Sequence, residues 1–240
     1  MLFEVKNLVK HFGGLAAVNN VTFQVNEGEI FGLIGPNGSG KTTIFNLISN
    51  FHPVTGGKIY FNNKNITGLK TNKICKLGIG RTFQVVKPLG RLSVLDNVIA
   101  GAFSKAESKG EARDIALETL EFCELIQRKD VIARSLPIGE RKRLEITRAM
   151  ATQPRLLLLD ETAAGLNPSE SAAAIALIQK IRDKGVTIII VEHIMKVMMT
   201  ISDRIHAINF GQTIAQGVPK EVSNNKAVIE AYLGEEYAHG

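Results

Sequence analysis

The stretch Gly35-Pro36-Asn37-Gly38-Ser39-Gly40-Lys41-Thr42 decides the fold. It matches the pattern G-x-x-x-x-G-K-[ST], in which small residues let successive backbone N–H groups curl around phosphate oxygens at a helix N-terminus. Residues 30–34 precede it as a short, wholly apolar strand, and residues 42–49 follow it with helical spacing. The sequence therefore predicts a phosphate-binding loop, or P-loop, in which Lys41 neutralises phosphate charge and the Thr42 hydroxyl holds Mg²⁺.

A carboxylate pair at the end of a second apolar strand suits the same chemistry. Residues 156–159 are all leucine, and Asp160 and Glu161 follow them directly. A P-loop needs a second carboxylate to position Mg²⁺, and Asp160 is the candidate. Glu161 can accept a proton from a water that attacks the terminal phosphate, so it is the candidate general base.

The rest of the chain predicts an α/β fold with helices inserted in its middle. Near the N-terminus, apolar and polar residues alternate as in antiparallel strands, and in the middle section the apolar residues have helical spacing. The predicted strands are 3–8, 21–25, 58–61, 156–159, 186–191 and a hairpin of 205–210 and 213–216; the predicted helices are 93–102, 110–126, 137–150 and 169–184. We therefore expect one domain over residues 1–240. Its catalytic core takes in about 1–84 and 151–240, and a helical subdomain takes in about 85–150.

The composition indicates a globular protein and gives no sign of a nucleic-acid, disulfide or zinc-binding class. The 240 residues are 45% apolar and 22% charged, as in ordinary globular domains. The net charge of +6 favours an anionic partner, but the densest basic cluster is only Arg141-Lys142-Arg143, so nucleic acid is not indicated. Cys75 and Cys123 lack the spacing of a disulfide framework or a zinc site.

The chain shows no signal for export or membrane insertion. Its first residues alternate like a strand, without the basic and apolar regions of a signal peptide. The longest apolar stretches, such as 186–191, fall far below the roughly 18 residues of a membrane span. We expect a cytoplasmic protein whose membrane association comes through a partner.

Further motifs carry a resemblance to a known family. Gln84 stands in Arg81-Thr82-Phe83-Gln84, Gly139 in Leu136-Pro137-Ile138-Gly139-Glu140, Gly165-Leu166-Asn167 follows Glu161, and His193 follows the strand 186–191. In order and spacing they resemble the nucleotide-binding domain of ABC transporters over nearly the whole chain. Five segments resemble, more closely, the ATPase of branched-chain amino acid importers, and of its two ATPases the first: residues 11–18, 81–84, 143–146, 163–168 and 231–234.

The resemblance implies a P-loop NTPase fold of the ABC type and an ATP-hydrolysing subunit that uses ATP and Mg²⁺. Dimer closure driven by ATP would power import of a small solute. The implied catalytic residues are Glu161, His193, Gln84 and Lys41, and the implied metal ligands are Thr42, Gln84 and Asp160. The implied nucleotide contacts are Phe12, Val18, Gly35, Pro36, Asn37, Gly38, Ser39, Gly40, Lys41, Thr42 and Thr43, with Gly139 acting across the dimer.

The signature segment departs from the family pattern. The usual LSGGQ appears as Leu136-Pro137-Ile138-Gly139-Glu140. Pro137 lacks the serine hydroxyl that reaches the opposite subunit's phosphate, and it has no N–H to replace it. This favours a hetero pair of ATPases over a homodimer. Thr162 and Ile194 are lesser departures, and neither removes a phosphate ligand.

The resemblance also implies partners and a location. They are two transmembrane permease subunits and, indirectly, an extracytoplasmic solute-binding protein, with this chain on the inner face of the membrane and no nucleic acid bound. Two alternatives stay open. One is a soluble ABC-type ATPase acting on nucleic acid or ribosomes. The other is an unrelated P-loop kinase or GTPase, although Asn63-Lys64-Asn65-Ile66 lacks the aspartate of a guanine-specific N-K-x-D motif.

Overall fold

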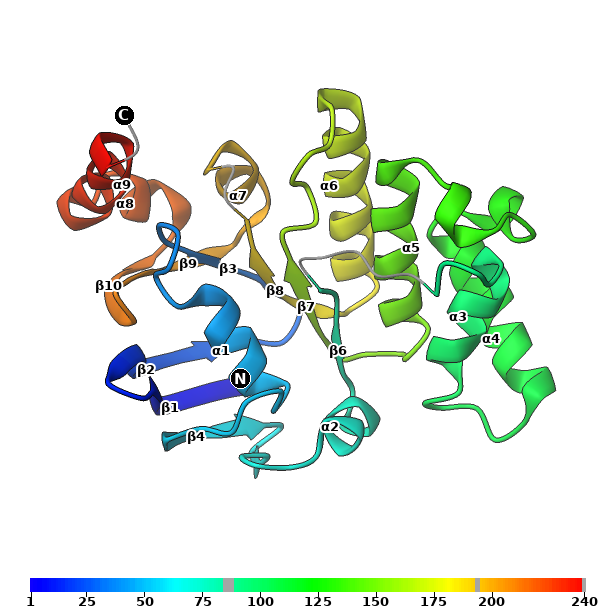
Figure 1. The fold of residues 1–240 in the computed structure, drawn as a ribbon, viewed down its shortest axis with the longest axis horizontal. Helices are drawn as coiled ribbons and strands as arrows, with labels where there is room; N and C mark the ends of the chain where they lie inside the picture. The colour runs from blue at the N-terminus through cyan, green and yellow to red at the C-terminus, as the bar shows by residue number, and fades with distance from the viewer. Residues whose placement is uncertain (84–88, 193–194, 239–240) are drawn as a thin grey trace. The chain divides into compact units, whose positions relative to one another are not determined.

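The chain forms two compact units. The computed structural model describes residues 1–83, 89–192 and 195–238 (Figure 1). The first unit comprises Met1–Ile74 and Thr187–Gly240, and the second comprises Cys75–Val186. The second unit therefore holds the predicted helical segments together with the strand that carries Asp160 and the helix after it.

An antiparallel sheet occupies the N-terminal part of the first unit. Its strand order is β2-β1-β4-β5. The strands are β1 (Phe3–Phe12), β2 (Leu15–Val25), β4 (Gly56–Phe61) and β5 (Lys64–Asn65). In β2, Val21, Phe23 and Val25 are buried while Thr22 and Gln24 are exposed, which confirms the predicted alternation of a half-buried strand. Figure 1 shows β1 and β2 in blue and β4 in cyan.

A largely parallel set of strands completes the first unit. β3 (Ile30–Ile34) pairs in parallel with β8 (Thr187–Val191) and β9 (Arg204–Asn209), and β10 (Gln212–Gly217) pairs antiparallel with β9. Every residue of β3 and β8 is buried, as expected for strands covered on both faces. The helices of this unit are α1 (Lys41–Ile48), α7 (Met195–Ile201), α8 (Pro219–Ser223) and α9 (Lys226–Ala238).

Aromatic side chains join the two sets of strands in one core. Phe23 of β2 stacks on Phe31 of β3, with ring centroids 5.3 Å apart and planes 18° from parallel. The His206 ring of β9 lies 5.2 Å from Phe23. Such contacts add to the apolar burial that stabilises the unit.

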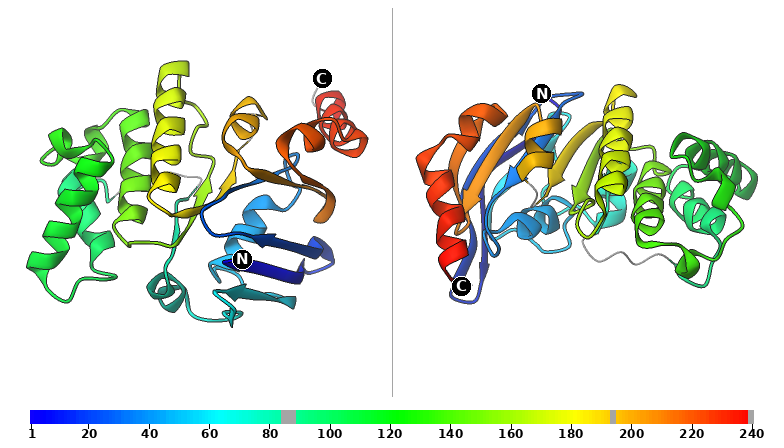
Figure 2. Two further views of the ribbon diagram at one scale, coloured as in Figure 1. Left: turned by 180° about the vertical axis from the view of Figure 1, so that it is seen from behind. Right: turned by 90° about the horizontal axis from the view of Figure 1, so that it is seen from above.

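The second unit combines a short parallel strand pair with helices. β6 (Ile79–Arg81) pairs with β7 (Leu156–Asp160). The helices are α3 (Val94–Ala102), α4 (Lys109–Phe122), η1 (Ile126–Arg128), η2 (Ala133–Ser135), α5 (Ile138–Met150) and α6 (Pro168–Asp183), and α2 (Thr71–Leu77) spans the boundary with the first unit. α5 and α6 lie side by side in every view (Figures 1 and 2). α3, α4 and α5 enclose an apolar core that includes Val98, Leu120 and Leu144.

Local sequence explains where these helices begin and end. Ser93 and Ser108 cap the N-termini of α3 and α4 with side-chain hydrogen bonds, and Asn167 forms a capping box with Glu170 on α6. The predicted helix 110–126 is too long at its C-terminal end. α4 stops at Phe122 because Glu124 takes a left-handed conformation with φ +58°.

The predicted α/β class is confirmed, with its N-terminal antiparallel strands and a run of helices between the strands of the core. Across the described ranges, no helix combines the length and the apolar character that crossing a membrane requires.

Candidate active site

The P-loop lies in the first unit, between a buried strand and a helix. β3 ends at Ile34 and α1 begins at Lys41, so the loop occupies the carboxyl end of a parallel strand. This is the edge at which open α/β sheets bind their ligands. The predicted strand, loop and helix are confirmed.

The loop backbone can receive an anion. Gly38 has φ +74°, and nothing lies within 4 Å of the position that a Cβ would take there. The N-cap of α1, Gly40, offers no side-chain cap, and the Ile44 N–H donates the helical bond to the Gly40 carbonyl. The N–H groups of residues 41–43, which precede this first helical bond, therefore point out of the helix N-terminus, where phosphate oxygens bind.

Lys41 is buried inside this loop. Its Nζ donates to the Gly35 carbonyl at 2.7 Å and to the Pro36 carbonyl at 2.9 Å. Only 5% of the residue is exposed, so its charge lies in a site of reduced dielectric, where it attracts phosphate more strongly than in water. Thr42 and Thr43 follow it in the first turn, half-buried. The loop residues thus fit a nucleoside triphosphate.

One contact of the P-loop comes from the far end of the chain. The Gly35 N–H donates to the Tyr232 hydroxyl of α9 at 2.9 Å, across 197 residues of sequence. Tyr232 is not among the residues predicted to contact the nucleotide. Its one signal in the sequence was its place in the segment Ala231-Tyr232-Leu233-Gly234, which resembles the importer ATPases.

Phe12 and Val18, two of the implied nucleotide contacts, differ in exposure. Phe12, at the end of β1, is 44% exposed; its ring meets His52 edge-on at 5.3 Å, and the Lys10 ammonium lies 4.8 Å from its centroid. Val18 is fully buried in β2, opposite Lys10. Stacking of Phe12 and contact through Val18 stay predictions.

In the second unit, Asp160 forms a buried ion pair. Its Oδ2 lies 3.3 Å from the Arg81 guanidinium, and both side chains are almost wholly enclosed. Burial lowers the pKa of Arg81, and the Asp160 charge opposes that change. The pairing of Arg81 with Asp160 could not be predicted from local sequence, because the two residues are 79 positions apart. A buried carboxylate with oxygen donors suits Mg²⁺.

Glu161, the candidate base, follows β7 in an unusual conformation. Its φ is +50° and only 8% of the residue is exposed. The backbone at this turn is held from α5 by Lys142, whose Nζ donates to the Glu161 carbonyl at 2.9 Å. Gln84 and His193, the other predicted catalytic residues, lie outside the described residues.

The signature segment forms the start of α5. Pro137 is the N-cap and makes no side-chain cap bond, while Gly139 lies in the first turn. A Cβ on Gly139 would stand 2.7 Å from Glu170 Oε1 of α6, so Gly139 packs directly against the end of that side chain. The helix N-terminus therefore offers backbone N–H groups, and it does so without the usual serine.

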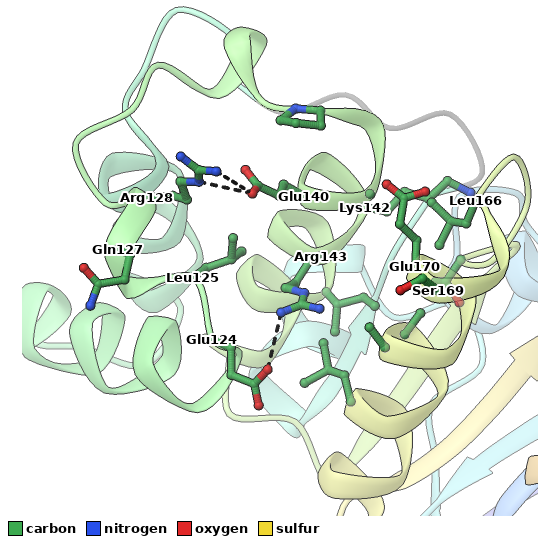
Figure 3. Close-up of a pocket in the computed structure, with 17 residues that line it drawn as sticks. Glu124, Leu125, Gln127, Arg128, Glu140, Lys142, Arg143, Leu166, Ser169 and Glu170 are labelled. Atoms are coloured by element: carbon green, nitrogen blue, oxygen red, sulfur yellow. Dashed lines mark hydrogen bonds and ion pairs between the residues drawn. The ribbon is translucent and has the colours of Figure 1, made fainter.

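A cavity of about 400 Å³ borders this segment, between α5, α6 and η1 (Figure 3). Two ion pairs line it: Arg128 with Glu140 at 3.0 Å, and Arg143 with Glu124 at 3.5 Å. Its apolar wall includes Leu125. Because each arginine is paired with a glutamate, these four side chains together present no net positive charge to a triphosphate.

Comparison with known proteins places the chain in a family. A family model described as ABC transporter matches residues 18–164, more than half of the sequence. The chain belongs to the ABC transporter family. A second model, described as branched-chain amino acid ATP-binding cassette transporter, matches residues 212–238 of this ABC chain. Membership rules out the unrelated kinase or GTPase that the sequence left open.

Relatives match this ABC chain along its whole length. The high-affinity branched-chain amino acid transport ATP-binding protein LivG of Salmonella typhimurium is 42% identical, and the match covers 98% of each chain. The corresponding protein BraF of Pseudomonas aeruginosa is also 42% identical over 98% of each chain. A solved ATP-binding cassette of an ABC transporter, in its ADP conformation, superposes with a TM-score of 0.89 at 33% identity, covering 98% of this chain and 99% of its own.

Proposed function

We propose that this chain is the ATP-hydrolysing subunit of a membrane importer for branched-chain amino acids. The observation that carries the ATPase assignment is the P-loop, with Lys41 buried inside it and α1 uncapped behind it. The substrate class rests on the relatives named for branched-chain amino acid transport and on the match of residues 212–238.

In this proposal, different residues of the chain contact the phosphates, the base, Mg²⁺ and the attacking water. The P-loop N–H groups and Lys41 bind the phosphates, and Phe12 and Val18 bind the base. Thr42, Gln84 and Asp160 would hold Mg²⁺, which supplies a positive charge to the phosphate oxygens. Glu161 takes the proton of the attacking water on a carboxylate oxygen, while His193 donates to the terminal phosphate and orients Glu161. Gln84 links the phosphate to the membrane partner.

Completion of the site requires a second ATPase subunit. Gly139 and the N-terminus of α5 act on the partner's nucleotide, and the partner's signature acts on this chain's. Because Pro137 supplies neither a hydroxyl nor an N–H, we favour a hetero pair, in which the companion carries the complete signature. Two permease subunits and an extracytoplasmic binding protein complete the importer, with this chain on the inner face of the membrane.

The molar mass of the Glu161→Gln variant, measured by light scattering with and without Mg-ATP, tests the dimer. Removal of the base traps a closed ATP sandwich wherever one can form. We expect a monomer without nucleotide and little dimer with it. A clean dimer with Mg-ATP would show that this chain pairs with itself and would refute the hetero pair.

Uptake of labelled leucine tests the substrate. Deletion of the gene in the native host should abolish high-affinity uptake, the wild-type chain should restore it, and the Glu161→Gln chain should not. Unchanged uptake after deletion would contradict the proposed substrate. Loss of ATP hydrolysis by the assembled pair of ATPases, when it contains the Glu161→Gln chain in place of the wild-type chain, tests the ATPase assignment separately.

A further inference from the structure

Two charged side chains of α5 are buried on the same face. Lys142 is 8% exposed and Glu145 is 6% exposed, and they stand three residues apart, which places them on neighbouring positions of one helix face. A lysine and a glutamate are almost never this deeply buried without partners, because burial of a charge is costly. Their partners therefore indicate what they do.

Lys142 fastens the turn that carries Glu161. Its Nζ donates to the Glu161 carbonyl at 2.9 Å and also to the Ala164 carbonyl, so one ammonium bridges both ends of the turn after β7. Glu161 has φ +50°, a conformation that a residue with a side chain keeps only when its surroundings hold it. The Lys142 ammonium stabilises this conformation, because a charged donor makes a strong hydrogen bond to a carbonyl.

Glu145 fastens the segment that leads into Gln84. Its Oε1 accepts the Phe83 N–H at 3.0 Å, and Phe83 directly precedes Gln84 in the sequence. Burial raises the pKa of Glu145, while the Phe83 N–H and the charges of Arg148 and Lys142 act against this rise. The two buried charges thus support each other on the helix.

We propose that Lys142 and Glu145 are positioning residues of the ATPase reaction. They fasten α5, the helix that starts at the signature segment, to the backbone beside Glu161 and beside Gln84. A displacement of α5, when its N-terminus engages the partner's nucleotide, is thereby transmitted to the catalytic segments of its own chain. This inference rests on the proposed function and adds the coupling between the two half-sites.

The first test compares Lys142→Met, Lys142→Arg and a matched control. Lys180→Met is the control, because the Lys180 Nζ also donates to a backbone carbonyl of this unit, that of Phe122 at 2.9 Å. With each variant assembled with the companion ATPase, we expect Lys142→Met to lower kcat for ATP by about 10- to 100-fold, as misplacement of a reacting group does, with KM within about twofold. Lys142→Arg keeps charged donors and should restore most of kcat. Lys180→Met should leave kcat unchanged.

The companion test uses Glu145→Met and Glu145→Gln. The amide oxygen of Gln can still accept the Phe83 N–H, whereas Met cannot. We expect kcat to fall in Glu145→Met and to recover in Glu145→Gln. Loss of kcat that neither conservative variant restores, in chains with wild-type melting temperatures, would overturn the proposal.

Hydrogen exchange separates this inference from the proposed function. In Lys142→Met, amides of the turn 161–166 should exchange about tenfold faster, the effect of losing roughly one hydrogen bond, while Lys180→Met should not change them. Unchanged exchange would overturn the inference even if the chain hydrolyses ATP. A wild-type chain that binds Mg-ATP but never hydrolyses it, with or without a companion ATPase, would overturn the proposed function. It would also overturn the positioning role of Lys142 in the reaction, whatever the exchange result.

Discussion

At Gly40, backbone conformation and crowding together restrict the P-loop to glycine. The residue has φ +109°, and a Cβ would lie 2.6 Å from the Ala17 carbonyl oxygen. A contact with backbone cannot be relieved by rotating a side chain, so the loop itself would have to move. Since Lys41 follows immediately, any such movement displaces the ammonium from its place in the loop.

We therefore predict that Gly40→Ala lowers the free energy of unfolding by about 1–3 kcal/mol and weakens ATP binding by at least about tenfold. Chemical denaturation and titration with a fluorescent ATP analogue measure the two effects. Gly38→Ala is the control for crowding, because Gly38 also has a positive φ, of +74°, but its Cβ would enter open space. Equal losses of stability in the two variants would contradict the crowding argument.

At the scale of the elements, the β9–β10 hairpin carries a histidine that folding keeps neutral. His206 is fully buried; its Nδ1 lies 3.0 Å from Gln216 Oε1 and its Nε2 lies 3.0 Å from Thr213 Oγ1. A neutral ring with its proton on Nδ1 satisfies both, because it donates to the amide oxygen and accepts from the hydroxyl. Burial, together with the Arg204 charge, lowers the pKa of His206 to about 4, against the opposing effect of the Gln216 hydrogen bond.

This depressed pKa predicts a loss of stability in acid. The unfolded chain binds a proton near pH 6.5 and the folded chain only near pH 4, so stability is complete above about pH 6.5 and falls as the pH drops toward 4. The full loss from this group amounts to about 3 kcal/mol. Urea unfolding between pH 4 and 8 measures it, and His206→Gln should flatten that part of the curve. Parallel pH curves for the two chains would refute the assignment.

The helices show where sequence patterns succeed at this scale and where they fail. Capping residues such as Ser93 and Asn167 act within a few residues, so helix starts follow from the sequence. The end of α4 does not follow from the sequence. Apolar spacing continues to Ile126, but Glu124 turns the chain and places Leu125 in the wall of the cavity beside α5 (Figure 3). The spacing of apolar residues predicts that Leu125 is buried, but it does not predict which element buries it.

At the scale of the whole molecule, we expect the altered signature to govern how the chain pairs with an ATPase partner. Pro137 caps α5 without a side-chain hydrogen bond, and Ile138 replaces the first glycine of the family pattern. Both changes fall on the helix terminus that would face the partner's nucleotide, so we expect them to weaken pairing of the chain with itself.

We predict that restoring the family pattern with Pro137→Ser and Ile138→Gly, in the Glu161→Gln chain, shifts the mass measured by light scattering with Mg-ATP toward a dimer. One added hydroxyl contact to a charged group, worth about 1.5–3 kcal/mol, strengthens association by about 10- to 100-fold at each of two sites. Adding Lys41→Ala should abolish the dimer by removing a phosphate ligand. A restored signature that leaves the chain monomeric would show that other surfaces prevent self-pairing.

The sequence by itself determined the P-loop, the strand that ends at Asp160, the α/β class and the family. These features depend on contiguous residues, because glycine conformations, apolar runs and helix caps act within one turn or strand. Only the tertiary structure decided that Arg81 pairs with Asp160, that Tyr232 binds the Gly35 N–H and that Lys142 holds the Glu161 carbonyl. These partners stand 79, 197 and 19 residues apart, and no period or local propensity encodes such contacts. They arise when strand pairing and helix packing bring distant backbone together, and the cost of burying unpaired polar groups then selects the side chain that satisfies them.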